Sequence, residues 1–396
     1  MRSPARAAAA LAAAALTALG ITASARASDT LPTTRDISYA GATISVPASW
    51  PVYDLTTDPH RCVRFDQHAV YLGHPGPDQN CPSHLVGRTS AVLIEPYDET
   101  ARTHVETGSD GTVQHLSANG QAMITATYGG DGPAAATAAL KGTDLSTAAP
   151  QASESVTADA APPDTATPAR KTFTGKGFDT CAAPSLASMR AWGQSSPYGA
   201  VGIYVGGISR GCGLGNLDHG WVQSVRGYGF HFIPTYVGRQ APCTGFSSKI
   251  STDSAVAHSQ GTWAAQDAIR AMRALGFGAG SPVYIDIEQY DGDAACSNAV
   301  VQFVAGWSGQ LHKDGFLSGF YSSQLSDIIA KRHIAHPDAV WIAHWDWNRS
   351  VYGQSSIADD LWNQHRRLHQ YAGPHGARYG GVTINIDSDA IDGPVG

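Results

Sequence analysis

Eight strand-like runs recur over residues 171–396, and most are separated by stretches with helical character. Each run is short and rich in the β-branched and aromatic residues that strands favour. The runs are residues 175–179, 200–205, 230–237, 283–288, 317–322, 340–345, 368–371 and 382–387. Strands that alternate with helices in this way predict an α/β fold, a (β/α)8 TIM-type barrel. An open doubly wound sheet is the alternative, but no glycine-rich phosphate-binding motif follows the first run.

Four stretches between the strands have the apolar periodicity of helices. They are residues 185–192, 217–228, 262–275 and 298–313. In the third of them Ala265, Ile269 and Met272 share one face, and Gly276 directly after it is a typical C-terminal cap.

The fourth strand-like run carries two carboxylates. Residues 282–288 read PVYIDIE, so Asp286 and Glu288 are two positions apart. On a strand they point to the same face, while Ile285 and Ile287 take the other. Burying two like charges side by side is costly, because they repel and lose water. The strand therefore predicts an acid site, and the structural alternative is an Asp held by backbone donors beside a solvated Glu.

The barrel prediction gathers polar and aromatic side chains at one rim, because active sites of this fold lie at the C-terminal strand ends. The acids expected there are Asp179, Asp286, Glu288 and Asp387. The side chains expected to contact a substrate are Tyr204, Tyr236, Tyr321, Trp345, Gln370 and Tyr371. Aromatic faces stack on pyranose rings, and paired carboxylates supply acid and base at a glycosidic bond. The pattern predicts a sugar site with no metal and no cofactor.

The N-terminus has the features of an export signal. Arg2 and Arg6 form a short basic region before an apolar run over residues 7–21. Ala25-Arg26-Ala27 then provides a typical cleavage site. Residues 1–27 are therefore predicted to be a signal peptide, and the mature protein to be secreted and extracellular. The apolar run is short for a membrane span, and no later stretch qualifies, so no membrane association is expected after cleavage.

Composition divides the mature chain. Residues 132–170 are mostly Ala, Thr, Ser, Pro and Asp, which bury too little apolar surface to fold and predict a linker. Residues 171–396 after it form the predicted barrel, and residues 28–131 before it form a small β-rich domain of unknown function. Strands of that domain are expected at residues 43–46, 69–72, 90–94 and 123–128.

Neither half of the mature chain is basic. Residues 28–170 hold seven basic and 16 acidic side chains, and residues 171–396 hold 16 basic and 17 acidic ones. A nucleic-acid partner is therefore not expected. Net charge does not support attraction to anionic cell-wall polymers either. The expected protein is a monomer, and the sugar site predicts a polysaccharide partner, which the resemblance described below implies to be a cell-wall glycan.

Six cysteines in an exported chain predict disulfides. Cys62 and Cys81 are the only two of the first domain and are expected to pair. The other four follow the first four barrel strands in turn: Cys181, Cys212, Cys243 and Cys296. Neighbouring loops favour pairing the first two and the last two of these, although four cysteines allow three pairings.

Motifs recur in order along the barrel: GFDTCAAPS, GIYVGG, PTYVGRQAPC, YIDIE, GFYSS, VWIAHWD, HQYAG and GGVTINIDSDAID. They resemble the secreted actinobacterial glycoside-hydrolase-like family catalogued as domain of unknown function 1906, which is related to the family 25 lysozymes. The resemblance covers residues 171–396. It implies Glu288 as the catalytic acid, completed by Asp286, Asp179 and Asp387, and a muramidase-like action on β-linked amino-sugar glycan such as peptidoglycan or chitin. The disulfide-rich rim loops depart from the lysozymes.

Within the carboxylate pair, Glu288 lies nearer the strand end, where the scissile bond would sit. Glu288 is therefore expected to hold a proton near neutral pH. Asp286 is expected to stay ionised and to raise the pKa of Glu288 through its charge.

Three other interpretations remain. The same groove suits a non-catalytic module that binds cell-wall glycan. Residues 207–211 match G-x-S-x-G, but no helix follows at once, as the nucleophile of a serine hydrolase requires. His333, His336 and His344 are close in sequence but lack the i, i+4 helical spacing of a metalloprotease.

Histidines also gather around the loop between the first two cysteines. They are His60, His68, His74 and His84. Their spacing is not that of a metal site, so solvated loop histidines are expected.

Overall fold

The computed structural model describes residues 34–97, 112–116, 121–129, 171–213 and 215–396. Residues Thr34–Gly396 group into one compact unit. The predicted signal peptide and linker lie outside the described residues. Within the described ranges, no helix combines the length and the apolar character needed to cross a membrane.

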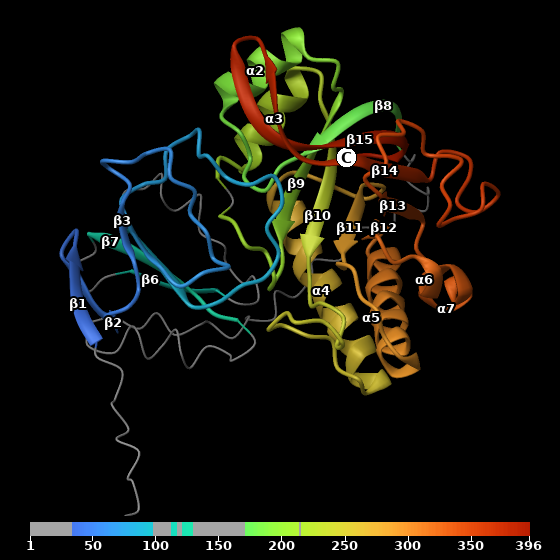
Figure 1. Cartoon of the computed structure of the whole chain (residues 1–396), viewed down its shortest axis with the longest axis horizontal. Coiled ribbons are helices and arrows are strands. Elements are labelled where there is room, and N and C mark those ends of the chain that lie inside the picture. Colours follow the sequence, from blue (N-terminus) through green and yellow to red (C-terminus); the bar gives the residue numbers. More distant parts are fainter. Residues whose placement is uncertain (1–33, 98–111, 117–120, 130–170, 214) are drawn as a thin grey trace, which may run out of the picture. The chain divides into compact units, whose positions relative to one another are not determined.

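A closed barrel of eight strands forms the C-terminal part, which confirms the predicted fold class (Figure 1). The strands are β8 (Thr172–Asp179), β9 (Ala200–Gly206), β10 (His231–Val237), β11 (Pro282–Asp286), β12 (Leu317–Ser322), β13 (Ala339–Ala343), β14 (Arg367–Tyr379) and β15 (Val382–Pro394). Neighbouring strands from β8 to β14 are parallel, so their C-terminal ends form one rim.

The last strand departs from the expected (β/α)8 pattern. β14 and β15 form an antiparallel hairpin, and β15 is also antiparallel to β8. Gly380 and Gly381 make the turn with φ of 57° and 83°, which a two-residue hairpin requires. A Gly-Gly pair between two alternating runs is a sequence signal for a hairpin, so the antiparallel direction of β15 could have been predicted. Because β15 runs antiparallel to β8, its middle reaches the rim, with Asp387 directly opposite Asp179.

Helices lie outside the barrel strands (Figure 1). They are α2 (Leu186–Ser195), α3 (His219–Gly227), α4 (Ser254–Ala274), α5 (Ala294–Lys313), α6 (Ser326–Ala330) and α7 (Arg332–Ala335). α4 and α5 begin earlier than expected. Asp253 and Asp293 cap them, because each carboxylate accepts hydrogen bonds from two backbone amides of the first turn.

α4 and α5 approach each other closely through glycine. A Cβ added at Gly261 of α4 would lie 1.9 Å from the carbonyl oxygen of Phe303 on α5. A Cβ added at Gly306 of α5 would lie 2.0 Å from the carbonyl oxygen of His258 on α4. The obstacles are backbone atoms, so an added methyl group must separate the helices.

Gly261→Ala is therefore expected to lower the free energy of unfolding by about 1–3 kcal/mol, the usual cost of overpacking. Gly309→Ala is the control, since Gly309 is an exposed residue of α5 with open space around it. There the change should stabilise the helix by up to about 1 kcal/mol. Urea unfolding measures the free energy of unfolding of both variants. An equal change in the two would contradict the close approach of α4 and α5.

Side chains alternate between the two faces of the barrel wall. Interior residues form an apolar cluster that includes Ile233, Tyr284, Trp341, Leu368 and Ile391. Outward residues pack against the helices, among them Phe232, Val283, Ile285, Phe320 and Ile342. Towards the rim, acids and an amide follow in the interior rows, which positions the candidate site.

The N-terminal part is β-rich, as expected. β1 (Thr34–Tyr39) and β2 (Ala42–Pro47) form a hairpin. A five-stranded sheet has the order β3 (Val52–Asp54), β4 (Val70–Leu72), β5 (Ala91–Pro96), β7 (Ala122–Thr127) and β6 (Thr112–Leu116). The four strands expected from the sequence correspond to β2, β4, β5 and β7.

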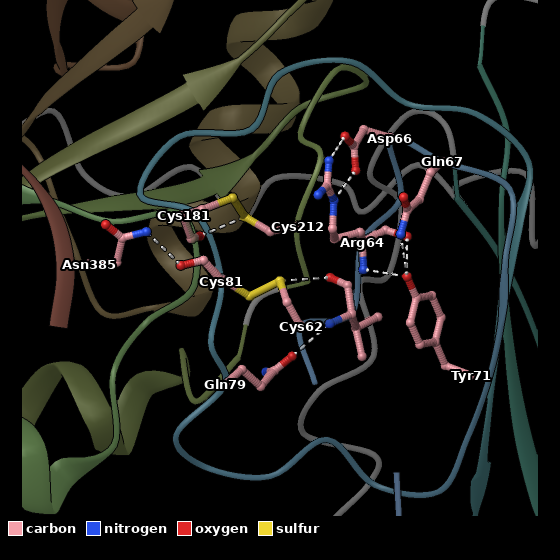
Figure 2. Close-up of a disulfide and its surroundings, with 11 residues drawn as sticks. Cys62, Arg64, Asp66, Gln67, Tyr71, Gln79, Cys81, Cys181, Cys212 and Asn385 are labelled. Atoms are coloured by element: carbon pink, nitrogen blue, oxygen red, sulfur yellow. Dashed lines mark hydrogen bonds and ion pairs between the residues drawn. A yellow bond between two sulfur atoms is a disulfide. The ribbon is translucent and has the colours of Figure 1, made fainter. Parts of the chain in front are cut away.

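The disulfide pairs are Cys62–Cys81, Cys181–Cys212 and Cys243–Cys296. These are the pairings favoured by neighbouring loops, so that prediction is confirmed. The first two disulfides lie near each other, with Asn385 of β15 close by (Figure 2).

Candidate functional site

β11 presents its carboxylates as the sequence predicts. Asp286 follows Tyr284 in the interior row, and the Ile285 side chain packs outward. Glu288 comes two residues later, where its backbone N–H donates to Gln240 Oε1 at 2.8 Å. Gln240 Nε2 donates to the carbonyl oxygen of Asp286 at 2.9 Å. Gln240 thus holds both ends of the pair, whose carboxylate oxygens lie within 4.8 Å of each other.

Gln370 of β14 joins two further acids across the barrel. Its Nε2 donates to Asp179 Oδ2 at 2.9 Å and to Asp387 Oδ2 at 3.4 Å. Its Oε1 accepts from the Tyr321 hydroxyl at 3.0 Å and from Trp345 Nε1 at 2.9 Å. Gln370 was predicted as a substrate contact, and here its amide is occupied in orienting acids and aromatic side chains.

Asp389 is a fifth acid that the sequence analysis missed. It is fully buried, and its Oδ1 accepts from Trp341 Nε1 at 3.0 Å. Asp389 follows Asp387 by two positions on β15. The spacing that selected Asp286 and Glu288 could therefore have found it.

Ser83 and His84 of the N-terminal part also belong to this site, and neither was predicted. The Ser83 hydroxyl donates to Asp387 Oδ1 at 2.8 Å. His84 Nε2 lies 2.9 Å from Glu288 Oε1, and its Nδ1 lies 2.8 Å from the Tyr204 hydroxyl. His84 is therefore not the solvated loop residue that was expected. No sequence signal could have placed it here, because 204 residues separate it from Glu288.

Three of the other predicted contacts reach the site. Tyr204 and Tyr321 are buried within it, and each makes a hydrogen bond given above. Trp345 is exposed over 57% of its surface, and the nearby Trp347 over 69%. Trp345 donates to Gln370, so it provides an exposed aromatic surface beside the acids, whereas the ring of Trp347 lies 6.2 Å from that of His375.

Tyr236 and Tyr371 do not reach the site, so the prediction for them is wrong. The Tyr236 hydroxyl donates to Asp267 on α4 at 2.8 Å, on the outside of the barrel. Tyr371 packs outward with Val351, next to the inward Gln370. Both errors have one cause: neighbouring residues on a strand face opposite sides.

Burial sets the protonation of most acids in the cluster. It raises the pKa of Asp179 and Asp389 above the ordinary value. Burial and the charge of Asp179 raise the pKa of Asp387 to about 8. Burial raises the pKa of Asp286 well above its ordinary value, and the charge of Glu288 adds to this.

His84 reverses the effect at Glu288. Burial alone would raise the pKa of Glu288, but the charge and hydrogen bond of His84 outweigh it, so this pKa is lowered. For His84 the two effects have opposite signs. Burial alone would lower its pKa, but the charge and hydrogen bond of Glu288 raise it to about 10. The pKa of Asp286 is thus raised and that of Glu288 lowered, which is the reverse of the order expected from the sequence.

A cavity of about 510 Å³ is lined by residues that flank two of the acids in sequence, although none of the five acids lines it. Thr180, directly after Asp179, and Asn385, two residues before Asp387, belong to its lining. The N-terminal part contributes Asp78, Gln79 and Asn80. No Lys, Arg or His lines it, so its chemistry suits an uncharged polar ligand better than an anion.

The alternative chemistries find limited support. Ser209 of the G-x-S-x-G stretch is buried in a turn, and the next helix begins only at His219. His333 and His336 are exposed on and after α7. Within the part of the chain that the structure describes, three groupings have metal-ligand proximity: His84 with Asp286 and Glu288, His84 with Asp179 and Asp387, and His344 with Asp346 and His369.

A family model for the Rv2525c-like, glycoside hydrolase-like domain matches residues 190–391. This chain belongs to that family. The match includes Asp286, Glu288, Asp387 and Asp389, whereas Asp179 and His84 precede it. The family residues therefore supply most of the acid site, and the remainder comes from earlier in the chain.

Solved structures with a similar fold include the Tat-secreted protein Rv2525c of Mycobacterium tuberculosis, in complex with L-tartrate. It shares 16% identity over 56% of this chain and 96% of its own, with a TM-score of 0.37. The catalytic domain of endolysin ply40, from bacteriophage P40 of Listeria monocytogenes, shares 15% sequence identity over 56% of this chain and 94% of its own, with a TM-score of 0.35. GHIP of Streptococcus pneumoniae, a glycosyl hydrolase 25, shares 10% sequence identity over 55% of this chain and 86% of its own, with a TM-score of 0.35. No curated protein matches the sequence.

Proposed function

We propose that this protein is exported and that its barrel hydrolyses β-linked amino-sugar glycan of the peptidoglycan or chitin type. The observation that carries the proposal is the Asp286–Glu288 pair, set among three more acids at a rim with the exposed Trp345. Carboxyl pairs catalyse glycoside hydrolysis, and tryptophan faces stack on sugar rings.

Glu288 is the group proposed to face the scissile bond, because 25% of its side chain is exposed whereas Asp286 is buried. It would donate a proton to the leaving oxygen as the glycosidic C–O bond breaks. An inverting mechanism needs about 6.5–9.5 Å between its two carboxyl groups to hold a water. The oxygens of this pair approach within 4.8 Å, so Asp286 is proposed to steer the substrate's own N-acetyl group.

The neighbouring cavity is proposed to hold a further sugar unit. Its lining offers amide and hydroxyl groups from Gln79, Asn80, Thr180 and Asn385 and contains no cation. An N-acetylglucosamine unit is neutral and rich in hydroxyl groups, which matches that lining. The three disulfides fit an oxidising, extracellular setting, and a monomer is proposed.

A glycan-binding module without turnover is the second candidate. The observation that favours it is burial, because Asp179, Asp286, Asp387 and Asp389 are each at most 1% exposed. Incubating the full chain with purified peptidoglycan and with chitin oligosaccharides separates the candidates. Release of new reducing ends supports hydrolysis, whereas sedimentation with the polymer and no release at any pH supports binding alone.

Trp345→Ala is expected to weaken binding about tenfold to whichever glycan the protein binds in that experiment, because an exposed aromatic face that can stack on a sugar ring would be lost. Trp263→Ala is the matched control, because Trp263 is 40% exposed on α4, away from the rim. Isothermal titration with soluble glycan fragments measures both. Equal affinity of the two variants would place the glycan elsewhere.

A further inference from the structure

The loop that carries Ser83 and His84 is fixed on both sides. Before them, Cys81 is bonded to Cys62, and its carbonyl oxygen accepts from Asn385 Nδ2 at 3.2 Å (Figure 2). After them, Leu85 packs with Tyr204 in a buried cluster.

Backbone hydrogen bonds hold the same loop to the segment after β9. The Gly87 N–H donates to the Ser209 carbonyl at 2.7 Å, and the Gly211 N–H donates to the Leu85 carbonyl at 3.1 Å. His84 thus sits in the rim as a fixed part of the wall.

His84 is surrounded by acids and phenols from five elements. Glu288 and Asp286 come from β11 and its end, Asp179 from β8, Tyr204 from β9, Tyr321 from β12 and Asp387 from β15. Of the described lysines and arginines, none forms an ion pair with the five acids of the cluster. His84 is therefore the cation of the site.

We propose that His84 is a positioning residue of the acid site: its ring binds Glu288 Oε1 as a fixed cation and keeps the proton of the Asp286–Glu288 pair on Asp286. The N-terminal part thus completes a site whose acids come from the barrel. A ligand that engages Glu288 must compete with this ion pair. The proposal concerns the resting protein and holds whether or not the barrel turns over glycan, although its effect on rate rests on the proposed function.

The chain has only five glutamates, Glu95, Glu99, Glu106, Glu154 and Glu288, which makes a direct test practical. Full-length protein carrying ¹³C-carboxyl glutamate is titrated by NMR, and Glu288→Gln assigns the Glu288 signal. In the wild type, Glu288 should titrate below the other glutamates. In His84→Gln, which keeps a hydrogen-bond donor but removes the charge, its midpoint should rise by about 1–3 pH units. His84→Lys should restore a low midpoint.

His74→Gln is the matched control, since His74 Nδ1 lies 3.2 Å from Glu95 on the exposed surface. That change should leave the Glu288 signal unmoved. A Glu288 midpoint above the other glutamates in the wild type overturns the proposal even if His84→Gln fails to fold. An unchanged midpoint in folded His84→Gln overturns it as well.

Turnover gives a second readout. If Glu288 must be protonated to act, the alkaline limb of the reducing-end pH profile should move to higher pH in His84→Gln. If the rate of His84→Gln rises equally at every pH and the profile does not shift, the loop only blocks access to the acids. If the rate falls equally at every pH, the role of His84 is purely structural. Either result contradicts the positioning role. Absence of turnover in every variant counts against the proposed hydrolysis and leaves the NMR test to decide this inference.

Discussion

Glu288→Gln is expected to reduce the release of reducing ends from peptidoglycan or chitin oligosaccharides at least about a hundredfold, while glycan binding stays within a few-fold. An amide has nearly the shape of a carboxyl but cannot donate its proton to the leaving oxygen, and general acid catalysis is worth about 10²–10⁴ in rate. The measurement is a reducing-end assay across acidic and neutral pH. Acidic conditions matter, because the charge of His84 lowers the pKa of Glu288.

Glu95→Gln is the control for this change, since Glu95 lies on β5 of the N-terminal sheet. It should leave the rate unchanged. Equal rates for wild type and Glu288→Gln would show that another group donates the proton. Asp286→Asn should also lower the rate strongly, because Asp286 is proposed to steer the substrate's N-acetyl group.

The folded protein is expected to be less stable at pH 9 than at pH 5, by about 2 kcal/mol or more. Burial and Asp179 raise the pKa of Asp387 to about 8, so the folded state holds a proton that the unfolded chain releases near pH 4. That contribution is complete below pH 4 and is lost as the pH rises through 8. His84 acts in the same direction at higher pH, because its pKa is raised to about 10 and its contribution is lost above the ordinary value of 6.5.

Urea unfolding at a series of pH values measures this slope. Asp387→Asn should flatten it between pH 5 and 8, because an amide does not titrate. Asp360→Asn changes an exposed carboxylate on the surface and should leave the slope as in the wild type. Stability that rises from pH 5 to 9 would mean that the cluster is ionised in the folded state.

The barrel could be predicted because its signals are local. Runs such as residues 200–205 and 283–288 are short, apolar and separated by helical periodicity, so each strand is visible without its partners. The antiparallel direction of β15 also had a local signal, the Gly380-Gly381 pair between two alternating runs, which is typical of a two-residue hairpin. The expected (β/α)8 pattern disagrees with that signal at this one strand.

The site divides in the same way. Asp286 and Glu288 share a face because they are two residues apart, and that holds in the structure. Tyr236 and Tyr371 lie at strand ends but face outward, because a place near the rim does not determine which face of the strand a residue occupies. The relative pKa values of the Asp286–Glu288 pair depend on His84, which lies in a part of the chain with no sequence signal linking it to the barrel.

Two hydrogen bonds of the site join residues very far apart in sequence. Ser83 to Asp387 spans 304 positions, and His84 to Glu288 spans 204. Closing such long loops has an entropic cost, and folds dominated by distant contacts form slowly. The Ser83 contact also needs β15, the last strand of the barrel. A chain synthesised from its N-terminus presents the Ser83–His84 loop first, but this loop can bind Asp387 only once the C-terminal strand is in place. We therefore expect the complete acid site to be among the last features of the fold to form.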